Sequence, residues 1–305
     1  RRYNSAMTSS SLHSSHDRSF ADNRFVYPVL SRRSGGMSIG VNLNPDKICN
    51  FDCIYCQVNR TTASETRFVE IQQLLDELQH MLELVLSDDI YTTECFSAVP
   101  EHLRRLNDIA FSGDGEPTTY KNFDDIIGQC AMLKQNISQH YADSNLQQPP
   151  DPIKMVLITN ASMFHREHVE RGLKILDQNQ GEIWAKLDAG TDDYYQLIER
   201  TAIPFQQVLD NLLTTARIRP LVIQSLFMQV NGTPPSDHEI QAYCQRLNEI
   251  TDNGGSLASV QIYTIARQPA ESYVTPLADE YVDAIVKQVT TQTGLRVEGF
   301  YGYQT

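Results

Sequence analysis

Short apolar segments alternate with amphipathic helical patterns along most of the 305-residue chain, and this alternation restricts the fold more than any other feature. Most of the apolar segments are continuous runs rather than strict alternations, which is typical of parallel strands buried on both faces. The predicted strands are Ser38–Leu43, Asp108–Phe111, Ile153–Ile158, Glu182–Leu187, Leu221–Val230 and Ser259–Ile265. The sequence therefore predicts an α/β fold built from right-handed strand–helix–strand units.

A helical pattern follows each predicted strand. The clearest runs from Phe68 to Leu86, with one apolar stripe at i, i+3, i+4 and i+7. Ser236 and Glu239 predict a capping box at the start of a later helix, and Pro276 predicts the first position of the last one. The other predicted helices begin at Phe123 or span His165–Leu176 and Phe205–Arg217.

Two closures of such a sheet fit the pattern, an open doubly wound sheet and a full or partial barrel. Both place function at the carboxyl ends of the strands. Unusual polar segments follow four of the predicted strands, and these are Cys49–Cys56, Gly113–Pro117, Thr159–Asn160 and Asp188. We therefore expect these segments to lie on one rim, with the loop over residues 140–152 at the opposite end.

Three of the six cysteines, Cys49, Cys53 and Cys56, lie within one short loop, and the other three are scattered. Clustered thiols in a long chain indicate metal ligation or redox chemistry rather than a disulfide framework. A structural zinc ion takes four protein ligands, and an iron–sulfur cube usually takes four cysteines as well. The loop offers three, which leaves one iron of a cube with an open position. A zinc knuckle and three buried thiols are the alternatives.

The C-x3-C-x2-C spacing, with Tyr55 before the last cysteine, resembles the radical S-adenosylmethionine (SAM) superfamily. The sequence around this loop resembles a branch of small Fe–S oxidoreductases related to the wyosine-forming tRNA enzymes. The segments that carry this resemblance are Pro28–Arg33, Ser38–Leu43, Pro45–Lys47 and Cys49–Val58. The resemblance covers roughly residues 25 to 270. It implies a partial (β/α)6 TIM-like barrel of parallel strands with outer helices.

The resemblance also implies the cofactors. Cys49, Cys53 and Cys56 would hold a [4Fe–4S] cluster, and SAM would chelate the open iron through its amine and carboxylate. An electron from the reduced cluster would cleave SAM, and the 5′-deoxyadenosyl radical would abstract a substrate hydrogen. A reductant protein such as flavodoxin or ferredoxin is the implied partner.

Further SAM contacts are implied at the other strand ends. Gly113, Asp114, Gly115 and Glu116 match the glycine-rich motif that binds the methionine amine, although Asp114 departs from the usual glycine doublet. The other implied contacts are Thr159, Asn160, Lys186 and Asp188 for the ribose and the carboxylate, and Tyr55 and Ile265 for the adenine.

Each of these contacts has a structural alternative. The Gly113–Glu116 segment also fits a tight Asp-Gly turn. Asn160 also fits a helix cap, Asp188 a turn, Ile265 a core strand, and Tyr55 simple packing.

Charge and composition restrict the partners. Lys+Arg 25 against Asp+Glu 38 gives a formal net charge of -13, which opposes a broad phosphate-binding surface. A small-molecule substrate is therefore expected, and nucleic acid and membrane are not. No cysteine precedes Cys49, whereas wyosine synthases as a family carry a further set for a second cluster, so a true wyosine synthase is not expected. We expect a cytoplasmic enzyme with a tail at residues 1–24 and a core domain with a C-terminal extension at residues 25–305.

Three functions stay open at this point. They are a radical SAM enzyme with an unidentified substrate, a tRNA-modifying enzyme like the wyosine relatives, and a non-enzymatic Fe–S electron carrier. The sequence does not identify the hydrogen that is abstracted.

Overall fold

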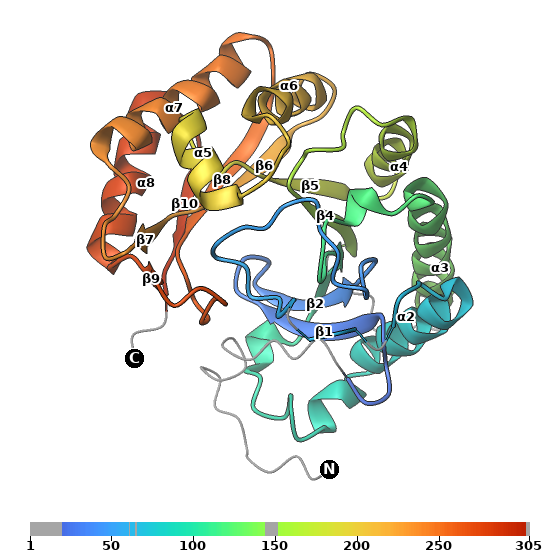
Figure 1. The fold of residues 1–305 in the computed structure, drawn as a ribbon. Coiled ribbons are helices and arrows are strands. Elements are labelled where there is room, and N and C mark those ends of the chain that lie inside the picture. The colour runs from blue at the N-terminus through green and yellow to red at the C-terminus, as the bar shows by residue number, and fades with distance from the viewer. Residues whose placement is uncertain (1–19, 61, 65, 144–151, 303–305) are drawn as a thin grey trace. The chain divides into compact units, whose positions relative to one another are not determined.

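The computed structural model describes residues 20–60, 62–64, 66–143 and 152–302. Its main sheet has eight strands in the order β1-β2-β3-β4-β5-β6-β8-β10 (Figure 1). They are β1 (Val26–Ser31), β2 (Gly36–Val41), β3 (Leu106–Phe111), β4 (Lys154–Thr159), β5 (Gly181–Lys186), β6 (Leu221–Leu226), β8 (Leu257–Tyr263) and β10 (Val297–Phe300). Helices connect most of the strands, so the predicted α/β class is confirmed.

The chain divides into two compact units, with boundaries after Asp46, Ala63, Val156, Glu170 and Gly181. One unit holds β1 to β3 with α2 (Ile71–Leu86) and α3 (Phe123–Asp143). The other holds the cysteine segment 47–63 and everything from Glu182 onward. Between them in sequence lie β4 and α4 (Glu167–Asp177), each of which is divided by a boundary.

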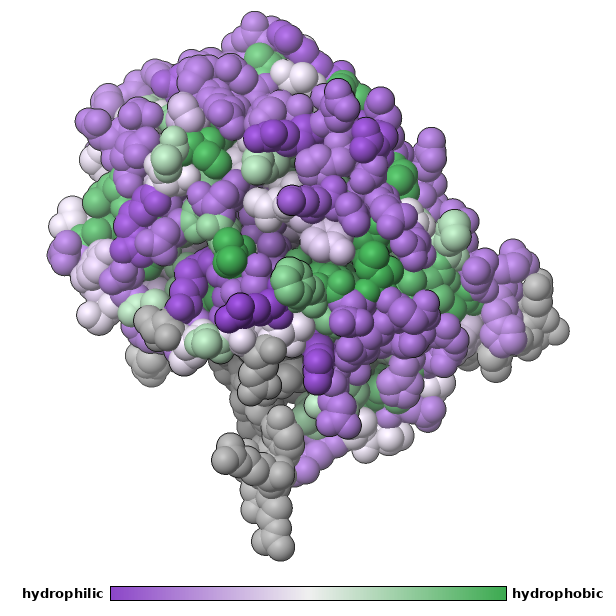
Figure 2. Space-filling model, turned by 45° about the vertical axis from the view of Figure 1, so that its right-hand side comes forward, coloured by the Kyte–Doolittle hydropathy of each residue, from purple (hydrophilic) through white to green (hydrophobic). Residues whose placement is uncertain are grey.

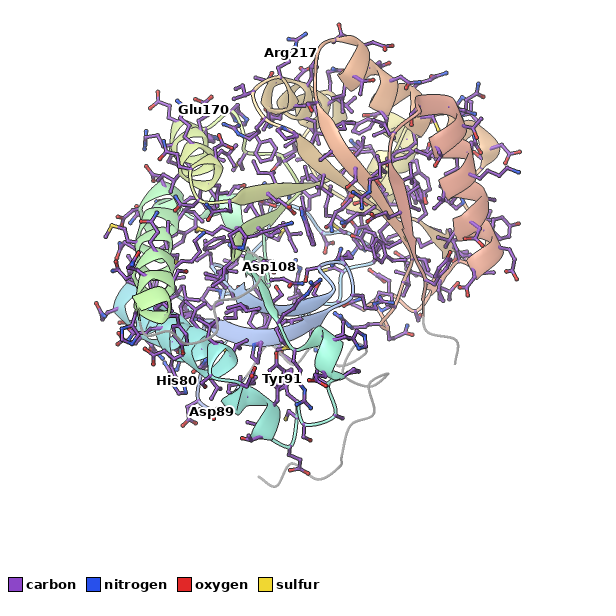
Figure 3. All side chains as sticks on the ribbon, turned by 180° about the vertical axis from the view of Figure 1, so that it is seen from behind. His80, Asp89, Tyr91, Asp108, Glu170 and Arg217 are labelled. Atoms are coloured by element: carbon purple, nitrogen blue, oxygen red, sulfur yellow. The ribbon has the colours of Figure 1, made fainter. Side chains whose placement is uncertain are left out.

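In the first unit, β1 pairs antiparallel with β2, and β2 pairs parallel with β3. Glu77 of α2 is buried and accepts hydrogen bonds from the backbone N–H groups of Arg24, Phe25 and Val26, at 3.0, 2.8 and 3.1 Å. These donors precede or begin β1, so one carboxylate fixes the edge strand to the helix layer. Asp108 of β3, which is labelled in Figure 3, accepts a hydrogen bond from Ser38 of β2.

In the second unit, β5, β6, β8 and β10 pair parallel to one another. Its helices are α5 (Asp192–Glu199), α6 (Phe205–Ala216), α7 (Asp237–Asp252) and α8 (Asp279–Thr293). Two short strands, β7 (Met228–Val230) and β9 (Val274–Pro276), form a separate antiparallel pair. The parallel strands end at the level of Lys186, Leu226 and Tyr263, and this end of the unit carries the groups described below.

Several predicted boundaries were wrong. The predicted strand Leu221–Val230 is interrupted at Phe227, whose ring packs edge-on against Tyr243 at 5.2 Å between centroids. Pro276 does not open a helix, because Thr275 and Pro276 belong to β9 and the last helix begins at Asp279.

The predicted capping box is half formed. The Ser236 hydroxyl accepts from the Glu239 N–H at 3.2 Å, as expected for an N-cap. The Glu239 carboxylate does not reach back to Ser236. It accepts instead from the Gly190 N–H and from the Thr191 hydroxyl. The tertiary contact therefore replaces the local one.

Some expectations fall largely outside the described residues, namely the tail at 1–24 and the loop at 140–152. Within the described residues, no helix combines the length and apolar character that crossing a membrane requires. The face in Figure 2 is mainly hydrophilic, with apolar residues in small groups.

Candidate functional site

The cysteine segment, residues 47–63, is held by the end of α5. The Asp52 and Ile54 N–H groups donate to the backbone carbonyls of Glu199 and Ile198, at 3.1 and 2.9 Å. The Thr201 hydroxyl donates to the Asn50 carbonyl at 2.9 Å. Main-chain and side-chain bonds to one helix end thus fix a segment that has no regular secondary structure of its own.

The three cysteines of this segment form no disulfide bond and are half-buried. The Cys56 N–H donates to the Cys53 carbonyl at 2.9 Å, which makes a tight turn between these two ligands. Among the described residues, no group of three or more His, Cys, Asp or Glu side chains is arranged around a single metal ion. Three soft thiols on an anchored loop are the donor set that an iron–sulfur cluster takes, with each thiol on a different iron, so the residues fit this group.

Burial and neighbouring charges influence the thiols. Burial raises the pKa of Cys53 well above its ordinary value, and the nearby Glu199 carboxylate raises it further. The Arg60 guanidinium donates to the Cys56 Sγ at 3.6 Å. Burial lowers the pKa of Arg60, but its contacts with Cys56 and Cys49 outweigh this and raise it overall. A bound metal would supply the positive charge that stabilises the thiolate of Cys53.

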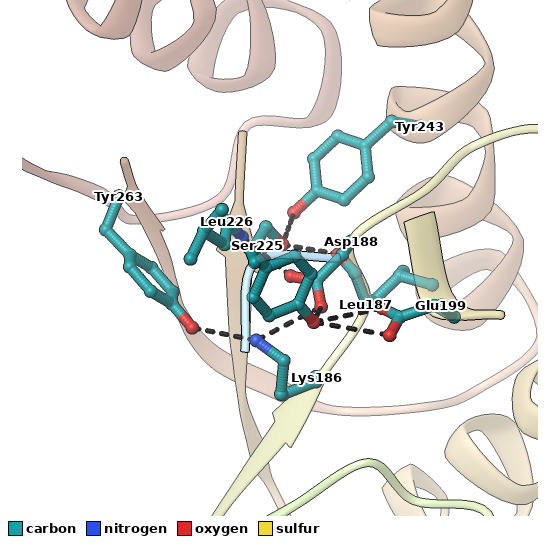
Figure 4. A network of polar contacts seen from close by, with 9 residues as sticks. Lys186, Leu187, Asp188, Glu199, Ser225, Leu226, Tyr243 and Tyr263 are labelled. Carbon is teal, nitrogen blue, oxygen red and sulfur yellow. Dashed lines mark hydrogen bonds and ion pairs between the residues drawn. The ribbon is translucent and has the colours of Figure 1, made fainter. Parts of the chain in front are cut away.

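Asp188 and Glu199, which Figure 4 labels, form a buried cluster with Tyr55, and both Glu199 and Tyr55 lie close enough to Cys53 to shift its pKa. The Tyr55 hydroxyl lies 2.6 Å from Asp188 Oδ2 and 3.1 Å from Glu199 Oε1. Burial, reinforced by the charge of Asp188, raises the pKa of Glu199 to about 8. The Tyr55 hydroxyl has one proton, so it can donate to only one of these two carboxylates at a time.

Lys186, at the end of β5, neutralises this cluster. Its Nζ lies 3.1 Å from Asp188 Oδ2, donates to the Tyr263 hydroxyl at 2.8 Å, and lies 4.9 Å from the centre of the Tyr55 ring. Burial lowers the pKa of Lys186, but Asp188, Tyr263 and Glu199 together outweigh it, so the net shift is upward. The second oxygen of Asp188 accepts from the Leu226 N–H at 2.6 Å. The two residues expected to contact SAM are thus bound to each other.

Asn160 connects the end of β4 to the cysteine segment. Its Nδ2 donates to Asn50 Oδ1 at 2.9 Å, and the Asn50 Nδ2 donates to the Ser162 hydroxyl at 2.7 Å. Asn160 Oδ1 accepts from the Ser162 N–H, and Thr159 Oγ1 accepts from the Ala161 N–H, each at 3.1 Å. These are turn interactions rather than a helix cap, because α4 begins at Glu167. They fix Asn50, the neighbour of the first ligand cysteine.

In the first unit, the Gly113–Glu116 segment is organised by Asn42, which follows β2. Asn42 Nδ2 donates to Asp114 Oδ2 at 2.8 Å, and Asn42 Oδ1 accepts from the Asp114 N–H at 3.2 Å. A Cβ on Gly113 would lie 2.2 Å from Asn42 Oδ1, so packing within the protein itself requires glycine there. Glu116 is buried and accepts from the Thr118 N–H at 3.1 Å, capping a short 3-10 turn over Pro117–Thr119.

Ile265 lies two residues beyond the end of β8 and is buried. Sequence reasoning missed two features of this end of the unit. Glu199 is one, since its neighbours in space are distant in sequence. Gln224 is the other, a fully buried amide in the apolar strand β6. A polar residue within a run of apolar ones was the signal that could have identified it.

Gln224 belongs to a polar row across the second unit. Lys186 is in register with Gln224, and Gln224 with Gln261, so the three side chains share one face of the sheet. Gln224 Nε2 donates to Gln261 Oε1 at 2.8 Å, while Gln224 Oε1 has no hydrogen-bond partner within the described part of the chain. A buried acceptor of this kind is normally satisfied by water or a ligand.

The sequence of the chain is similar to those of known proteins. The family model of the radical SAM superfamily matches residues 43–228, more than half of the chain. Among curated proteins, the chain is 22% identical to the GTPase Obg of Brachyspira hyodysenteriae over 90% of this chain and 35% of that protein. It is 24% identical to the UPF0026 protein MJ1312 of Methanocaldococcus jannaschii, over 85% of this chain and 68% of that protein.

Solved structures are also similar. The crystal structure of Streptococcus suis SuiB bound to S-adenosylmethionine matches with a TM-score of 0.55 and 11% identity, over 89% of this chain and 52% of that one. A structure of TYW1 with a lysine-pyruvate adduct bound has a TM-score of 0.48 and 12% identity, over 85% of this chain and 74% of that one. The chain thus spans about half of SuiB and about a third of the first relative named above.

The fold defines an α/β protein, and the likeness to SuiB confirms the partial TIM-like barrel class. The family match is more specific. The chain belongs to the radical SAM superfamily, whose members are enzymes that use SAM and an iron–sulfur cluster.

Proposed function

We propose that this protein is a radical SAM enzyme that holds a [4Fe–4S] cluster on Cys49, Cys53 and Cys56. The observation that carries the proposal is the three-thiol segment anchored to α5 within the part of the chain that the superfamily matches. When bound, the reduced cluster would supply the one electron that cleaves SAM into methionine and a 5′-deoxyadenosyl radical, which would abstract a hydrogen atom from the substrate.

The residues of the site would hold SAM in place. Glu116 would accept from the ammonium group of SAM beside the glycines at 113 and 115, with Asp114 fixed by Asn42. Lys186 has three N–H donors and uses two of them on Asp188 and Tyr263, so its third could bind the carboxylate.

We propose the remaining roles from the resemblance to the superfamily. Asp188 would orient Lys186, and Thr159 and Asn160 would bind the ribose edge. Tyr55 and Ile265 would lie near the adenine.

The substrate we propose is a polar small molecule. The row Lys186, Gln224 and Gln261 supports this, because an apolar substrate would leave the Gln224 oxygen without a donor. For the reductant we propose a one-electron protein donor such as flavodoxin or ferredoxin. Ile48, next to the first ligand cysteine, is 68% exposed and offers an apolar contact for such a protein. The six free cysteines suit the cytoplasm.

The test begins with anaerobic reconstitution and iron analysis. We expect about four irons per chain in a brown protein, and no stable cluster in Cys49→Ala, Cys53→Ala or Cys56→Ala. Cys95→Ala is the matched control and should keep its iron, since Cys95 lies outside the ligand segment. On reduction with dithionite, the protein should convert SAM to 5′-deoxyadenosine.

Glu116→Gln separates the binding roles. It should raise the Kd for SAM at least tenfold without reducing the iron content, because Glu116 would touch SAM and no iron. A colourless protein with one zinc ion per chain would contradict the proposal. A stable four-iron cluster that never cleaves SAM would point to an electron carrier.

A further inference from the structure

Arg60 is the cationic side chain that lies against a ligand sulfur. Its Nη2 donates to Cys56 Sγ at 3.6 Å, and the side chain is half-buried. Surface arginines usually keep their guanidinium in water, so a guanidinium turned toward a thiol needs a cause within the protein.

The backbone around Arg60 supplies that cause. Arg60 Nη1 donates to the Lys47 carbonyl, and Lys47 Nζ donates to the Thr62 hydroxyl at 3.0 Å. These two bonds join the beginning of the cysteine segment to its end. The guanidinium is therefore held in place by the same contacts that close the segment around the three thiols.

The charge of Arg60 is not cancelled by a carboxylate. Asp52, which lies within the segment, and Glu271 both pair with Arg200, at 3.0 and 2.6 Å. Within the described ranges, Arg60 forms no ion pair, and its Nε has no hydrogen-bond partner. A positive charge that no carboxylate pairs with among the described residues thus lies against the sulfur of one ligand.

We propose that Arg60 raises the reduction potential of the cluster by placing its charge beside the Cys56 sulfur and donating a hydrogen bond to it. This inference rests on the proposed function. A [4Fe–4S]2+ cluster with three thiolates carries a net charge of −1, and it gains one electron from a one-electron reductant to become −2. A fixed guanidinium stabilises the more negative form more strongly, so it favours the reduced state. Arg60 would then be a positioning and tuning residue that never touches the substrate.

The experiment is an anaerobic redox titration of the reconstituted protein without SAM, followed by the EPR signal of the reduced cluster. We compare wild type with Arg60→Gln, which removes the charge, and Arg60→Lys, which keeps it. At a fixed potential, Arg60→Gln should lower the ratio of reduced to oxidised cluster at least tenfold, which is about 59 mV for one electron. Arg60→Lys should recover most of this ratio.

Arg217→Gln is the matched control. Arg217, labelled in Figure 3, is exposed at the end of α6 and donates to a backbone carbonyl, that of Asn253, at 2.8 Å. Its variant should keep the wild-type potential. Omitting SAM from the titration separates an effect on the cluster from one on SAM binding.

The outcomes separate this inference from the proposed function. Wild type without a four-iron cluster would contradict the proposed function itself. A wild type that loads its cluster, with equal potentials in all Arg60 variants, would overturn the tuning role alone. Loss of the cluster from both Arg60→Gln and Arg60→Lys would also overturn it, since Arg60 would then be needed to close the segment.

Discussion

Lys186 and Asp188 lie two positions apart in the sequence, yet their contact depends on the whole second unit. Asp188 is 3% exposed and receives bonds from Tyr55, Lys186 and the Leu226 N–H. Three separate segments therefore meet at one carboxylate. A buried ion pair of this kind contributes little net stability, but removing one partner leaves the other buried without a counter-charge.

We predict that Lys186→Met alone lowers the free energy of unfolding by about 3 kcal/mol, because it leaves the buried Asp188 carboxyl group without its cationic partner. Adding Asp188→Asn should recover part of this loss, so the two changes are not additive. Trp184 in β5 is the only tryptophan, and its fluorescence reports urea unfolding beside the pair. Effects that add within about 0.5 kcal/mol would show that the two residues are not coupled.

Residue types and spacing were sufficient to predict the thiol segment and to single out Lys186 and Asp188, since both lie in short local patterns. They were not sufficient to predict the partners of these residues. Glu199 was missed because it acts through Tyr55, 144 positions away, and because it ends a helix of only eight residues. Gly113 was identified, but the packing of Asn42 against it is invisible without the fold.

At the scale of elements, a buried lysine joins α3 to two other elements of the first unit. Lys134 Nζ donates to the Ile153 and Asn179 carbonyls at 3.0 and 2.8 Å and to Gln180 Oε1 at 2.7 Å. These acceptors lie just before β4 and just after α4. Burial lowers the pKa of Lys134 to about 8, so its ordinary charge is disfavoured in the folded protein.

This shift predicts a pH dependence. Between pH 8 and about 10.5 the unfolded chain binds more protons at this lysine than the folded one, so stability rises with pH in this window and is lost as pH falls toward 8. Lys134→Met should lack this rise, while its lost hydrogen bonds lower stability equally at every pH. The difference in unfolding free energy between wild type and variant should thus grow from pH 8 to 10.5.

Lys174→Met, an exposed change on α4, should show a constant difference. A constant difference for Lys134→Met as well would contradict the shift.

Most strands and helices follow from periodicity, since parallel strands read as apolar runs and surface helices as stripes. The elements that the sequence analysis missed or misassigned each have a reason of their own. The antiparallel edge strand β1 contains Pro28, which argues against a strand unless it lies at an edge. The short α5 has too few turns for a stripe. Thr275 and Pro276 are residue types that favour the start of a helix, but they pair with β7 and form a strand instead.

At the scale of the whole molecule, a net charge of -13 governs which large ligands can bind. We predict that tRNA binds no more tightly than about 10⁻⁶ M near physiological salt, the range of non-specific contacts. The measurement is a titration of the reconstituted protein with tRNA at increasing salt. Tight binding that weakens steeply with salt, together with about eight irons per chain, would instead favour a tRNA-modifying enzyme like the wyosine relatives.

The bond from Thr201 to the Asn50 carbonyl spans 151 positions. During synthesis at about 5 to 20 residues per second, the cysteines precede this anchor by roughly 8 to 30 s. Throughout that interval the nascent chain contains the three thiols but not yet the end of α5 that anchors their segment. If the chain holds the proposed cluster, this order would place its loading after translation of α5, and a pause upstream of residue 199 would lengthen the time in which oxygen can reach these sulfurs.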